Sequence, residues 1–567
     1  MSRSTRRAAR LLAGIGVIAL VTGLGLVAAA PAYALTFTVT TAADTGPGSL
    51  RQAIIDSNTG PGLDTISIQP GLVIDMSTFT NQAVTDSVIV TGDASNPPTI
   101  IGPSHAPIFQ VTDMSATYIE VDNVTMKAST TVTSGDAITT VGGAGSLTLI
   151  GDTFENFPSP AVEILLSTGR LTVTDSVFSG NASTAADADG GAIVTGSIGV
   201  VTITGSTFSH NSAGKHGGAL ELNDARSVNI SGSTFDSNSA GIFGGAIAVT
   251  SLISDSTWTG NTFTGNTSGA ATSSIGGAAF YMGSVPTGAT FLIDQSTFSG
   301  NTAAAQSPAT AGAVGFIRDL QGAARVLNST MTGNSFTGVG SGAGGNGIDL
   351  SVSVIEATGE FDLGQSTFDE AASGDHLVYV TTNLGLTRLG SDTLSGPGVL
   401  IVSNDNNAAA DAVEVFDTIA VSTSSFAAID ISGTPAEISY SITSDSVNPE
   451  VVDLGGTQFG VSDPQLGALG NNGGPTQTRL PLPGSPAIDL GDPAFGGAPA
   501  TDQRGAGFPR ILNGRVDIGA VETPAATLAA TGLDPAPTVW TASTTLLTGA
   551  LLLGAVLLTR RRRNTAK

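Results

Sequence analysis

Short runs in which apolar and polar residues alternate recur along most of the chain. In Val200-Val201-Thr202-Ile203-Thr204 and in Ser227-Val228-Asn229-Ile230-Ser231, apolar residues return at every second position. This alternation is typical of strands that bury one face, and the runs are bounded by Gly, Asn, Asp and Ser, which favour turns. No long stretch between residues 60 and 520 has the period of an amphipathic helix. The pattern therefore predicts an all-β chain made of many short strands.

A phrase of Phe, two small or polar residues and Asn recurs within this pattern. Successive copies begin 30, 27, 28 and 35 residues apart, and a copy with Met331 in place of Phe follows 33 residues later. A period of 27–35 residues predicts a solenoid in which each copy belongs to one rung. The Phe and Asn pairs are Phe178 and Asn181, Phe208 and Asn211, Phe235 and Asn238, Phe263 and Asn266, and Phe298 and Asn301.

A second phrase, Gly-Gly-Ala followed by an apolar residue, lies between the copies of the first. Paired glycines permit positive φ and close backbone approach, so we expect tight corners there. The clearest pairs are Gly190 and Gly191, Gly217 and Gly218, and Gly244 and Gly245.

One unit of about 27 residues has room for about three short strands and three turns. Wound in one direction, such units form a right-handed parallel β-helix with rungs about 4.8 Å apart, so about 13 rungs give a rod on the order of 60 Å. We expect Phe to stack as an inward column and Asn to form an amide ladder between rungs. The alternative is that the asparagines face outward and bind sugar.

The two phrases, over about residues 175–350, resemble the repeats of chlamydial polymorphic outer membrane proteins. The resemblance implies a β-helix and an association with adhesion. It does not extend to an outer-membrane barrel at the C-terminus, so it implies nothing about the export route.

The N-terminus has the order of a secretory signal. Four Arg lie within the first ten residues, an apolar run extends from Leu11 to Ala30, and Ala32 and Ala34 occupy the −3 and −1 positions of a cleavage site. We expect cleavage after Ala34 and export of the body. The alternative is an uncleaved membrane anchor.

The C-terminus has three parts: Leu528-Ala529-Ala530-Thr531-Gly532, a Pro-bearing spacer, and an uncharged run, Trp540 to Thr559, that precedes four arginines. The run is long enough for a transmembrane helix, with the arginines on the cytoplasmic side. These parts resemble the cell-wall sorting signals of Gram-positive bacteria, in the LAXTG variant read by class E sortases of actinobacteria. The resemblance implies that a sortase cleaves after Thr531 and joins it to peptidoglycan; otherwise the helix remains as a membrane anchor.

Both ends of the solenoid are expected to be capped, because open strand edges invite aggregation. Ser49 could N-cap a short helix, Leu50 to Ser57, that follows a strand at Thr36 to Thr40. This segment resembles the CSLREA-type domain of bacterial surface proteins, with Gly48 in place of its Cys and Gln52 in place of its Glu. Residues 471–522, with Asn472-Gly473-Gly474-Pro475-Thr476, resemble the segment that ends many such proteins.

These features divide the chain into six segments. They are a signal peptide (1–34), an N-terminal cap with the first rungs (35–100), the β-helix repeats (101–450), the C-terminal end of the β-helix (451–523), a linker with the sorting motif (524–539), and a transmembrane helix with a basic tail (540–567).

Charge and composition narrow the function. The chain of 567 residues has 46 acidic and 21 basic residues, and nine of the bases lie in its first ten and last eight positions. The acidic body argues against nucleic acid as a partner, because attraction to phosphates needs clustered Lys and Arg. The absence of Cys excludes disulfides, thiolate metal sites and cysteine nucleophiles. His105, His210, His216 and His376 are scattered, so no zinc cluster is expected.

Parallel β-helices also include polysaccharide lyases and glycosidases, and hydrolysis needs two carboxyl groups about 5–9.5 Å apart. No acid pair is accompanied by His or Arg in a recurring motif; the pairs are Asp187 with Asp189, Asp369 with Glu370, and Asp411 with Glu414. Lys215-His216 is the most reactive-looking dipeptide, but in a variable turn we expect it to be solvated.

Calcium is the one cofactor that the turns suggest. Asp187-Ala188-Asp189 and Asn404-Asp405-Asn406-Asn407 offer hard oxygen ligands, but neither has a known loop spacing, so solvated acidic turns are expected and no cofactor is predicted.

The sequence thus predicts an exported β-helix surface protein, held by the cell wall or membrane, non-catalytic, and adhesin-like or structural. Its ligand, a glycan or another surface, is not specified. The first alternative is a β-helix enzyme that acts on extracellular polysaccharide, which would need acidic and basic residues on one exposed strand row. The second is a passive spacer.

Overall fold

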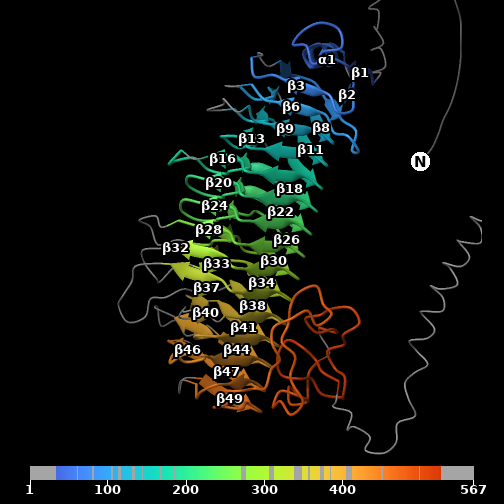
Figure 1. Ribbon diagram of the computed structural model, residues 1–567. Coiled ribbons are helices and arrows are strands. Elements are labelled where there is room, and N and C mark those ends of the chain that lie inside the picture. The colour runs from blue at the N-terminus through green and yellow to red at the C-terminus, as the bar shows by residue number, and fades with distance from the viewer. Residues whose placement is uncertain are drawn as a thin grey trace, which may run out of the picture.

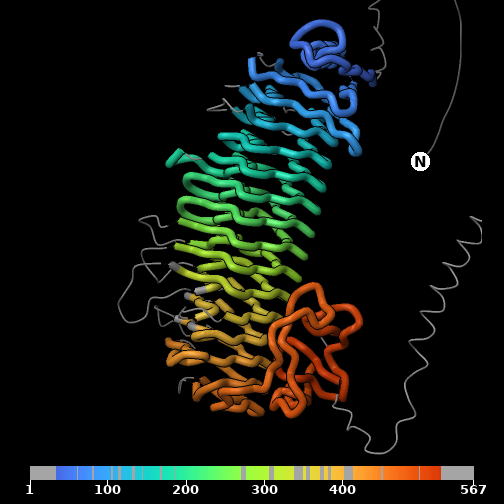
Figure 2. Tube along the Cα trace, in the orientation of Figure 1, coloured from blue at the N-terminus to red at the C-terminus, as the bar shows by residue number. Residues whose placement is uncertain are grey.

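The chain folds as a rod of stacked rungs (Figure 1). The computed structural model describes residues 34–524, except 61, 79–81, 104–105, 113–116, 130–134, 144, 166–168, 184, 270–275, 305–311, 338–347, 355–357, 371–375, 383–384, 404–411, 434, 448–450 and 497–498. The tube view in Figure 2 shows the path of the chain as successive turns that advance along one axis.

Four sheets run along the rod, and every pairing between their strands is parallel. Sheet A contains β1 (Thr36–Val39), β2 (Asp64–Ile68), β5 (Val88–Thr91), β8 (Tyr118–Asp122), β11 (Ser146–Ile150), β14 (Arg170–Thr174), β18 (Ile198–Thr204), β22 (Ala225–Ser231), β26 (Ser256–Thr259), β30 (Thr290–Asp294), β34 (Ala323–Leu327), β38 (Glu360–Gly364), β41 (Leu386–Gly390), β44 (Ala412–Phe416), β47 (Ala436–Ser439) and β49 (Val451–Gly455).

Sheet B follows sheet A in each rung. It contains β3 (Val73–Asp75), β6 (Thr99–Ile101), β9 (Thr125–Lys127), β12 (Thr153–Glu155), β15 (Val177–Ser179), β19 (Thr207–Ser209), β23 (Thr234–Asp236), β27 (Thr262–Thr264), β31 (Thr297–Ser299), β35 (Thr330–Thr332), β39 (Thr367–Asp369), β42 (Thr393–Gly396), β45 (Ile419–Ser422) and β48 (Ile442–Thr443).

Sheet C precedes sheet A of the next rung. It contains β4 (Ala83–Val84), β7 (Phe109–Val111), β10 (Ile138–Val141), β13 (Val162–Leu165), β17 (Ile193–Thr195), β21 (Leu220–Leu222), β25 (Ile247–Val249), β29 (Phe280–Val285), β33 (Gly312–Leu320), β37 (Ile348–Val354), β40 (His376–Thr382), β43 (Leu400–Ser403) and β46 (Ile429–Ser432).

Sheet D is the shortest and lies between sheets B and C in the middle rungs. It contains β16 (Ala182–Ser183), β20 (Ser212–Ala213), β24 (Ser239–Ala240), β28 (Thr267–Ser268), β32 (Thr302–Ala304) and β36 (Ser335–Thr337). The rungs that carry the Phe-x-x-Asn phrase therefore have a fourth strand, where the length of the unit suggested about three.

The prediction of an all-β parallel β-helix is confirmed. Sheet A has sixteen strands in the described residues, so at about 4.8 Å per spacing the rod is about 70 Å long. This exceeds the 60 Å expected from about 13 rungs, because some rungs are shorter than 27 residues, such as the 24 residues from Asp64 to Val88 and from Ser146 to Arg170.

Strand alternation places the core inside the rungs. In sheet A, inward residues such as Leu171, Val201 and Val228 are fully buried and paired in register, while Thr172 and Thr202 between them face outward. Each rung thus buries an apolar face only because another rung covers it, which makes the array cooperative between neighbours.

The predicted short helix is present. α1 (Leu50–Ser57) begins after Ser49, whose hydroxyl accepts a hydrogen bond from the Gln52 amide at 3.2 Å. Its buried residues include Leu50, Ala53 and Ile54, which join the core at one end of the rod (Figure 1). Within the described residues no helix has the length and apolarity that a bilayer crossing requires. The predicted segments at 11–30 and 540–559 lie outside those residues.

Residues 456–524 form a loop-rich unit, here called the C-terminal unit. It follows β49 and lies along the side of the last rungs rather than continuing the stack (Figures 1 and 2). Isolated bridges such as Leu466 with Pro481 hold its loops together.

Candidate functional site

The Phe residues of the repeat form one stack inside the rod. Successive rings of Phe154, Phe178, Phe208, Phe235, Phe263 and Phe298 lie 4.4–5.0 Å apart and within 8° of parallel, and all are fully buried. Met331 and Phe368 continue the column in register. The repeat Phe residues therefore pack the core.

The asparagines form a directed amide ladder beside the stack. Each side-chain Nδ2 donates to Oδ1 of the next asparagine at 2.9–3.0 Å, in the order Asn181, Asn211, Asn238, Asn266, Asn301 and Asn334. Each Nδ2 also donates to the backbone carbonyl of the stacked Phe one rung earlier, for example Asn238 to Phe208 at 3.0 Å. All six are buried, so they are not surface ligands for a sugar.

The glycine pairs make corners before sheet C. The first glycine of each pair has positive φ: 57° at Gly190, 62° at Gly217 and 66° at Gly244. A Cβ on the second would lie 2.1 Å from a carbonyl oxygen of the next rung at Gly191 and at Gly218, and 2.3 Å at Gly245. These positions bring adjacent rungs together at the corner.

The residue at the corner between sheet A and sheet B also has left-handed backbone, with positive φ, in successive rungs. In the middle rungs it is glycine, as at Gly205, Gly232 and Gly260, whereas in later rungs, and at Asn123 and Asp175 in earlier ones, it has a side chain. The later corner residues are Gln295, Asn328, Gln365, Ser391, Asp417 and Tyr440, with φ between 43° and 61°. Left-handed backbone costs a residue with a Cβ roughly 1–2 kcal/mol, so these side chains need a compensating role.

Several of these corner residues hold the C-terminal unit. Gln365 Nε2 donates to the Thr501 carbonyl at 2.6 Å, Thr476 donates to the Asn328 carbonyl at 2.9 Å, and the Asp492 amide donates to Asp417 Oδ1 at 2.6 Å. We call this contact line the seam.

Gln503 is the centre of the seam and is fully buried. Its Nε2 donates to the Ser329 carbonyl at 3.1 Å and to Thr476 Oγ1 at 3.0 Å, and its Oε1 accepts from Thr367 Oγ1 at 2.6 Å. The amide thus bonds two adjacent rungs and the unit itself.

A cavity of about 300 Å³ opens beside the seam. Its lining comes from four successive rungs and from the C-terminal unit: Leu327, Asn328, Asp362, Leu363, Gly364, Gln365, Arg388, Gly390, Ser391, Phe416, Phe495 and Pro499. We call it the seam pocket. Junctions of this kind, mostly apolar with a few convergent polar groups, are where small-molecule sites occur in proteins.

An ion-pair row forms one side of the seam pocket on the outer face of sheet A. Arg325 Nε lies 3.0 Å from Asp362 Oδ2, Arg388 Nη1 lies 3.7 Å from Asp362 Oδ1, and Arg388 Nε donates to Glu414 at 2.8 Å. Burial raises the pKa of Asp362, and the two arginines act against that rise. Asp362 and Arg388 thus line the cavity side by side, one as a hydrogen-bond acceptor and the other as a donor.

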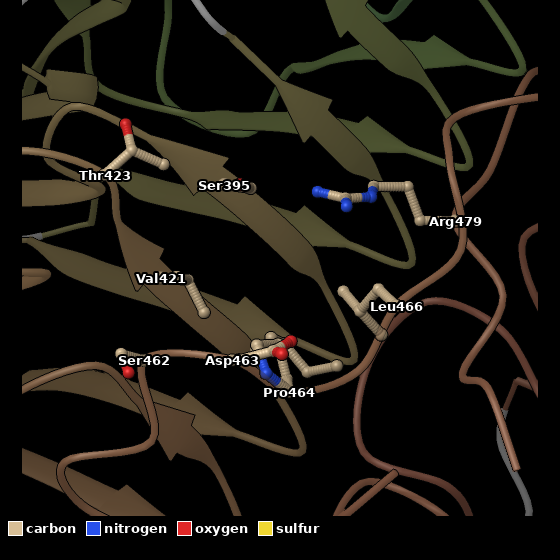
Figure 3. A pocket seen from close by; sticks show the side chains of 9 residues that line it. Ser395, Val421, Thr423, Ser462, Asp463, Pro464, Leu466 and Arg479 are labelled. Atoms are coloured by element: carbon tan, nitrogen blue, oxygen red, sulfur yellow. The ribbon is translucent and has the colours of Figure 1, made fainter.

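A smaller cavity of about 170 Å³ lies further along the same seam (Figure 3). Arg479 and Leu466 project from the C-terminal unit toward Ser395 and Val421 of the rungs. Arg479 is already bound to Asp369 Oδ1 at 3.1 Å and to the Gly467 carbonyl at 2.9 Å. Its polar groups are engaged in docking, which makes this cavity the weaker candidate.

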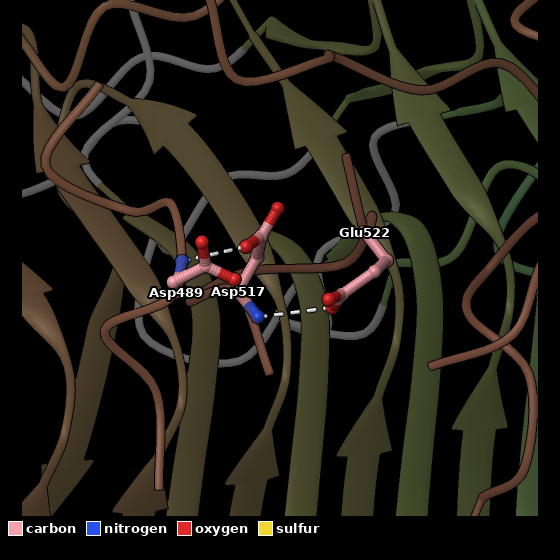
Figure 4. Close-up of side chains that lie close together, drawn as sticks. All are labelled: Asp489, Asp517 and Glu522. Carbon is pink, nitrogen blue, oxygen red and sulfur yellow. Dashed lines mark hydrogen bonds between the residues drawn. The ribbon is translucent and has the colours of Figure 1, made fainter. Parts of the chain in front are cut away.

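Three carboxylates converge inside the C-terminal unit: Asp489, Asp517 and Glu522 (Figure 4). Asp517 accepts from the Asp489 amide and from the amide and hydroxyl of Thr523, all at 2.7 Å. Glu522 accepts from the Asp517 amide at 2.9 Å, and Arg510 Nη1 lies 3.7 Å from Glu522. Backbone donors, one hydroxyl and one arginine thus surround Asp517 and Glu522, as expected of carboxylates that hold loops together, whereas Asp489 Oδ1 is buried without a hydrogen bond in the described residues.

Titratable residues also gather on the outer face of sheet C. Asp136 accepts from the Thr139 hydroxyl at 2.8 Å and interacts with Glu163; burial is the main cause that raises the pKa of both acids. Two rungs along, Glu221 is 1 % exposed, and burial raises its pKa well above the usual range.

The dipeptide Lys215-His216 lies on this same face. His216 Nδ1 is 3.0 Å from Asp189 Oδ1, and its ring stacks on Phe243 at 3.8 Å between centroids. The expectation of a solvated turn is therefore wrong for His216, whose side chain is only 14 % exposed. The stacking of rungs covers the His216 ring, because Phe243 occupies the equivalent turn one rung later.

Some predicted sites lie outside the described residues. They are Ala32, the sorting motif Leu528, Ala529, Ala530, Thr531 and Gly532, and the acidic turn at 404–407. In the other predicted acidic turn, Asp187 is exposed and Asp189 pairs with His216.

Sequence reasoning did not find the seam. Its residues share no period, and Gln503 contacts Ser329 across 174 positions of sequence. The change of corner residue from glycine is no specific signal either, because Asn123 and Asp175 occupy the same corner in rungs far from the C-terminal unit.

No model of a known protein family matches the chain, and no curated protein matches it either. The chain is therefore described by its fold, a parallel β-helix with a docked C-terminal unit.

Proposed function

We propose that this chain is an exported, non-catalytic surface protein whose β-helix is a rigid stalk of adhesin-like or structural function. The arrangement of the C-terminal unit is the main support. It buttresses the last rungs through Gln503 and Gln365, directly before the sequence that leads to the sorting motif.

In this proposal the stalk is held through its C-terminus. A sortase joins Thr531 to peptidoglycan, or the apolar run that follows stays in the membrane. The end capped by α1, about 70 Å from the other, is then the part furthest from the anchor.

Changing the acyl donor tests the anchoring. In cells of a Gram-positive host with a class E sortase, Thr531→Ala should move the protein from the wall fraction to the membrane or medium. Thr527→Ala, four residues earlier, is the matched control and should leave the wall-linked amount unchanged. Equal wall linkage of both variants would rule out the sortase step.

A further inference from the structure

One wall of the seam pocket is aromatic, and two glycines without side chains lie beside it. A Cβ on Gly390 would lie 2.4 Å from the Phe416 ring, and one on Gly364 would lie 3.1 Å from Leu327. The absence of a side chain at Gly390 leaves the space in which the Phe416 ring lies, and its absence at Gly364 leaves room for Leu327. Phe495 of the C-terminal unit supplies a second ring.

The polar groups of the pocket offer both an acceptor and a donor. Asp362 Oδ1 makes no hydrogen bond within the described part of the chain, although the atom itself is buried. The Arg388 side chain is 38 % exposed, and its five N–H groups exceed the contacts it makes with Glu414 and Asp362. A ligand hydroxyl could accept from Arg388, and an adjacent hydroxyl could donate to Asp362 once a shift of the lining side chains uncovers Oδ1.

Charge argues against a strongly ionic ligand. Arg325 and Arg388 face Glu360, Asp362 and Glu414 in one network, so the row is nearly balanced. The whole chain has a net charge of −25, which disfavours polyanions. A neutral ligand that both donates and accepts hydrogen bonds fits this environment best.

Size limits the ligand further. The cavity of about 300 Å³ stands at the low end of small-molecule sites, roughly 300–1,000 Å³. We propose that the seam pocket binds a neutral mono- or disaccharide unit, with the apolar face of one sugar ring on Phe495 or Phe416 and neighbouring hydroxyls on Asp362 and Arg388. This inference deepens the proposed function, on which it rests, by assigning the adhesive contact to the seam.

Calorimetry with the full chain, purified in mild detergent, tests the inference. The probes are glucose, galactose, mannose, N-acetylglucosamine, maltose, lactose and cellobiose. At least one should bind saturably, and Phe495→Ala should weaken it about tenfold or more through loss of the ring contact. Phe459→Ala, at an exposed Phe of the same unit outside the seam pocket, is the matched control and should bind as the unchanged chain does.

Two further variants separate binding from folding. Phe495→Leu keeps an apolar side chain without the ring, and Asp362→Asn keeps its shape but loses the charge; both should weaken binding while the thermal unfolding midpoint stays close to that of the control. Lack of binding by all seven sugars, or equal binding by Phe495→Ala and Phe459→Ala, would overturn the inference. The Thr531→Ala fractionation is independent of sugar, so a wall-linked chain that binds none of them refutes the pocket assignment alone.

Discussion

Asn334 Nδ2 donates a 3.0 Å hydrogen bond to Oε1 of Glu370, so a carboxyl group ends the amide ladder. The Asn334 backbone amide donates to the same oxygen at 3.2 Å. Glu370 also interacts with the buried Asp349 of the adjacent sheet C strand. Where the Asn repeat stops, Glu370 thus accepts the hydrogen bonds that the next asparagine accepts elsewhere in the ladder.

Glu370 should make stability depend on pH. Burial raises its pKa to about 7 from an ordinary 4.5, and burial also raises the pKa of Asp349. The folded chain therefore binds the proton more tightly than the unfolded chain. The stabilisation is full below pH 4.5 and is lost as pH rises through about 7, by an amount on the order of 1–3 kcal/mol.

Glu370→Gln is the corresponding test, since the amide can accept from Asn334 and donate to Asp349. Other buried acids such as Glu221 change stability in the same direction, so the difference between variant and unchanged chain is the useful quantity. Urea unfolding at pH 5 and pH 8 should show a smaller loss of stability for the variant. The exposed Glu437→Gln is the control, and identical pH dependence in all three chains would contradict the prediction.

The Phe stack should tolerate Met better than Ala. Phe235 lies between Phe208 and Phe263, with ring centroids at 5.0 and 4.9 Å. Phe235→Ala leaves a cavity and should cost about 3–5 kcal/mol. Phe235→Met should cost less than about 1.5 kcal/mol, because the chain itself uses Met331 in the same column. Hydrogen exchange of strands β19 to β27 checks this, and equal protection in the two variants would count against ring packing.

The glycine corners should be far more sensitive to substitution than a glycine in open space. A Cβ on Gly217, at φ 62°, would lie 2.2 Å from the Leu220 carbonyl oxygen. Gly46 also has positive φ, but its Cβ would meet nothing within 4 Å. Gly46→Ala should therefore cost only the conformational strain, about 1–2 kcal/mol. Thermal unfolding should rank Gly217→Ala clearly below Gly46→Ala, and the reverse order would refute the steric account.

Loss of Gln503 should release the C-terminal unit while the rod stays folded. Gln503→Ala leaves the Thr367 hydroxyl buried without its partner, at about 1–3 kcal/mol, and removes one of the two hydrogen bonds that the Ser329 carbonyl accepts. Limited proteolysis should then cut within 456–524 faster than in the unchanged chain. Gln69→Ala, at an exposed position near the other end, is the control and should not alter the cleavage rate.

The sequence predicted those parts of the molecule that repeat. Phe178 and Asn181 could be given inward packing and amide-ladder roles because the same residue types return at the same spacing in later rungs. Glu370 could not be recognised as the end of the ladder, because a single acid after Thr367-Phe368-Asp369 carries no period. His216 looked solvated in sequence because its partners, Asp189 and Phe243, belong to the rungs before and after it.

The sequence by itself determined the parallel β-helix, since alternating strands with a period of 27–35 residues bury their apolar faces only by stacking. Only the tertiary structure decided where residues 456–524 lie and that a pocket forms between Phe416 and Phe495. The physical reason is that rung stacking joins each residue to its counterpart one period away, which a periodic sequence records. Docking of the unit depends on single contacts such as Gln503 with Ser329, whose partners are far apart in sequence and occur once.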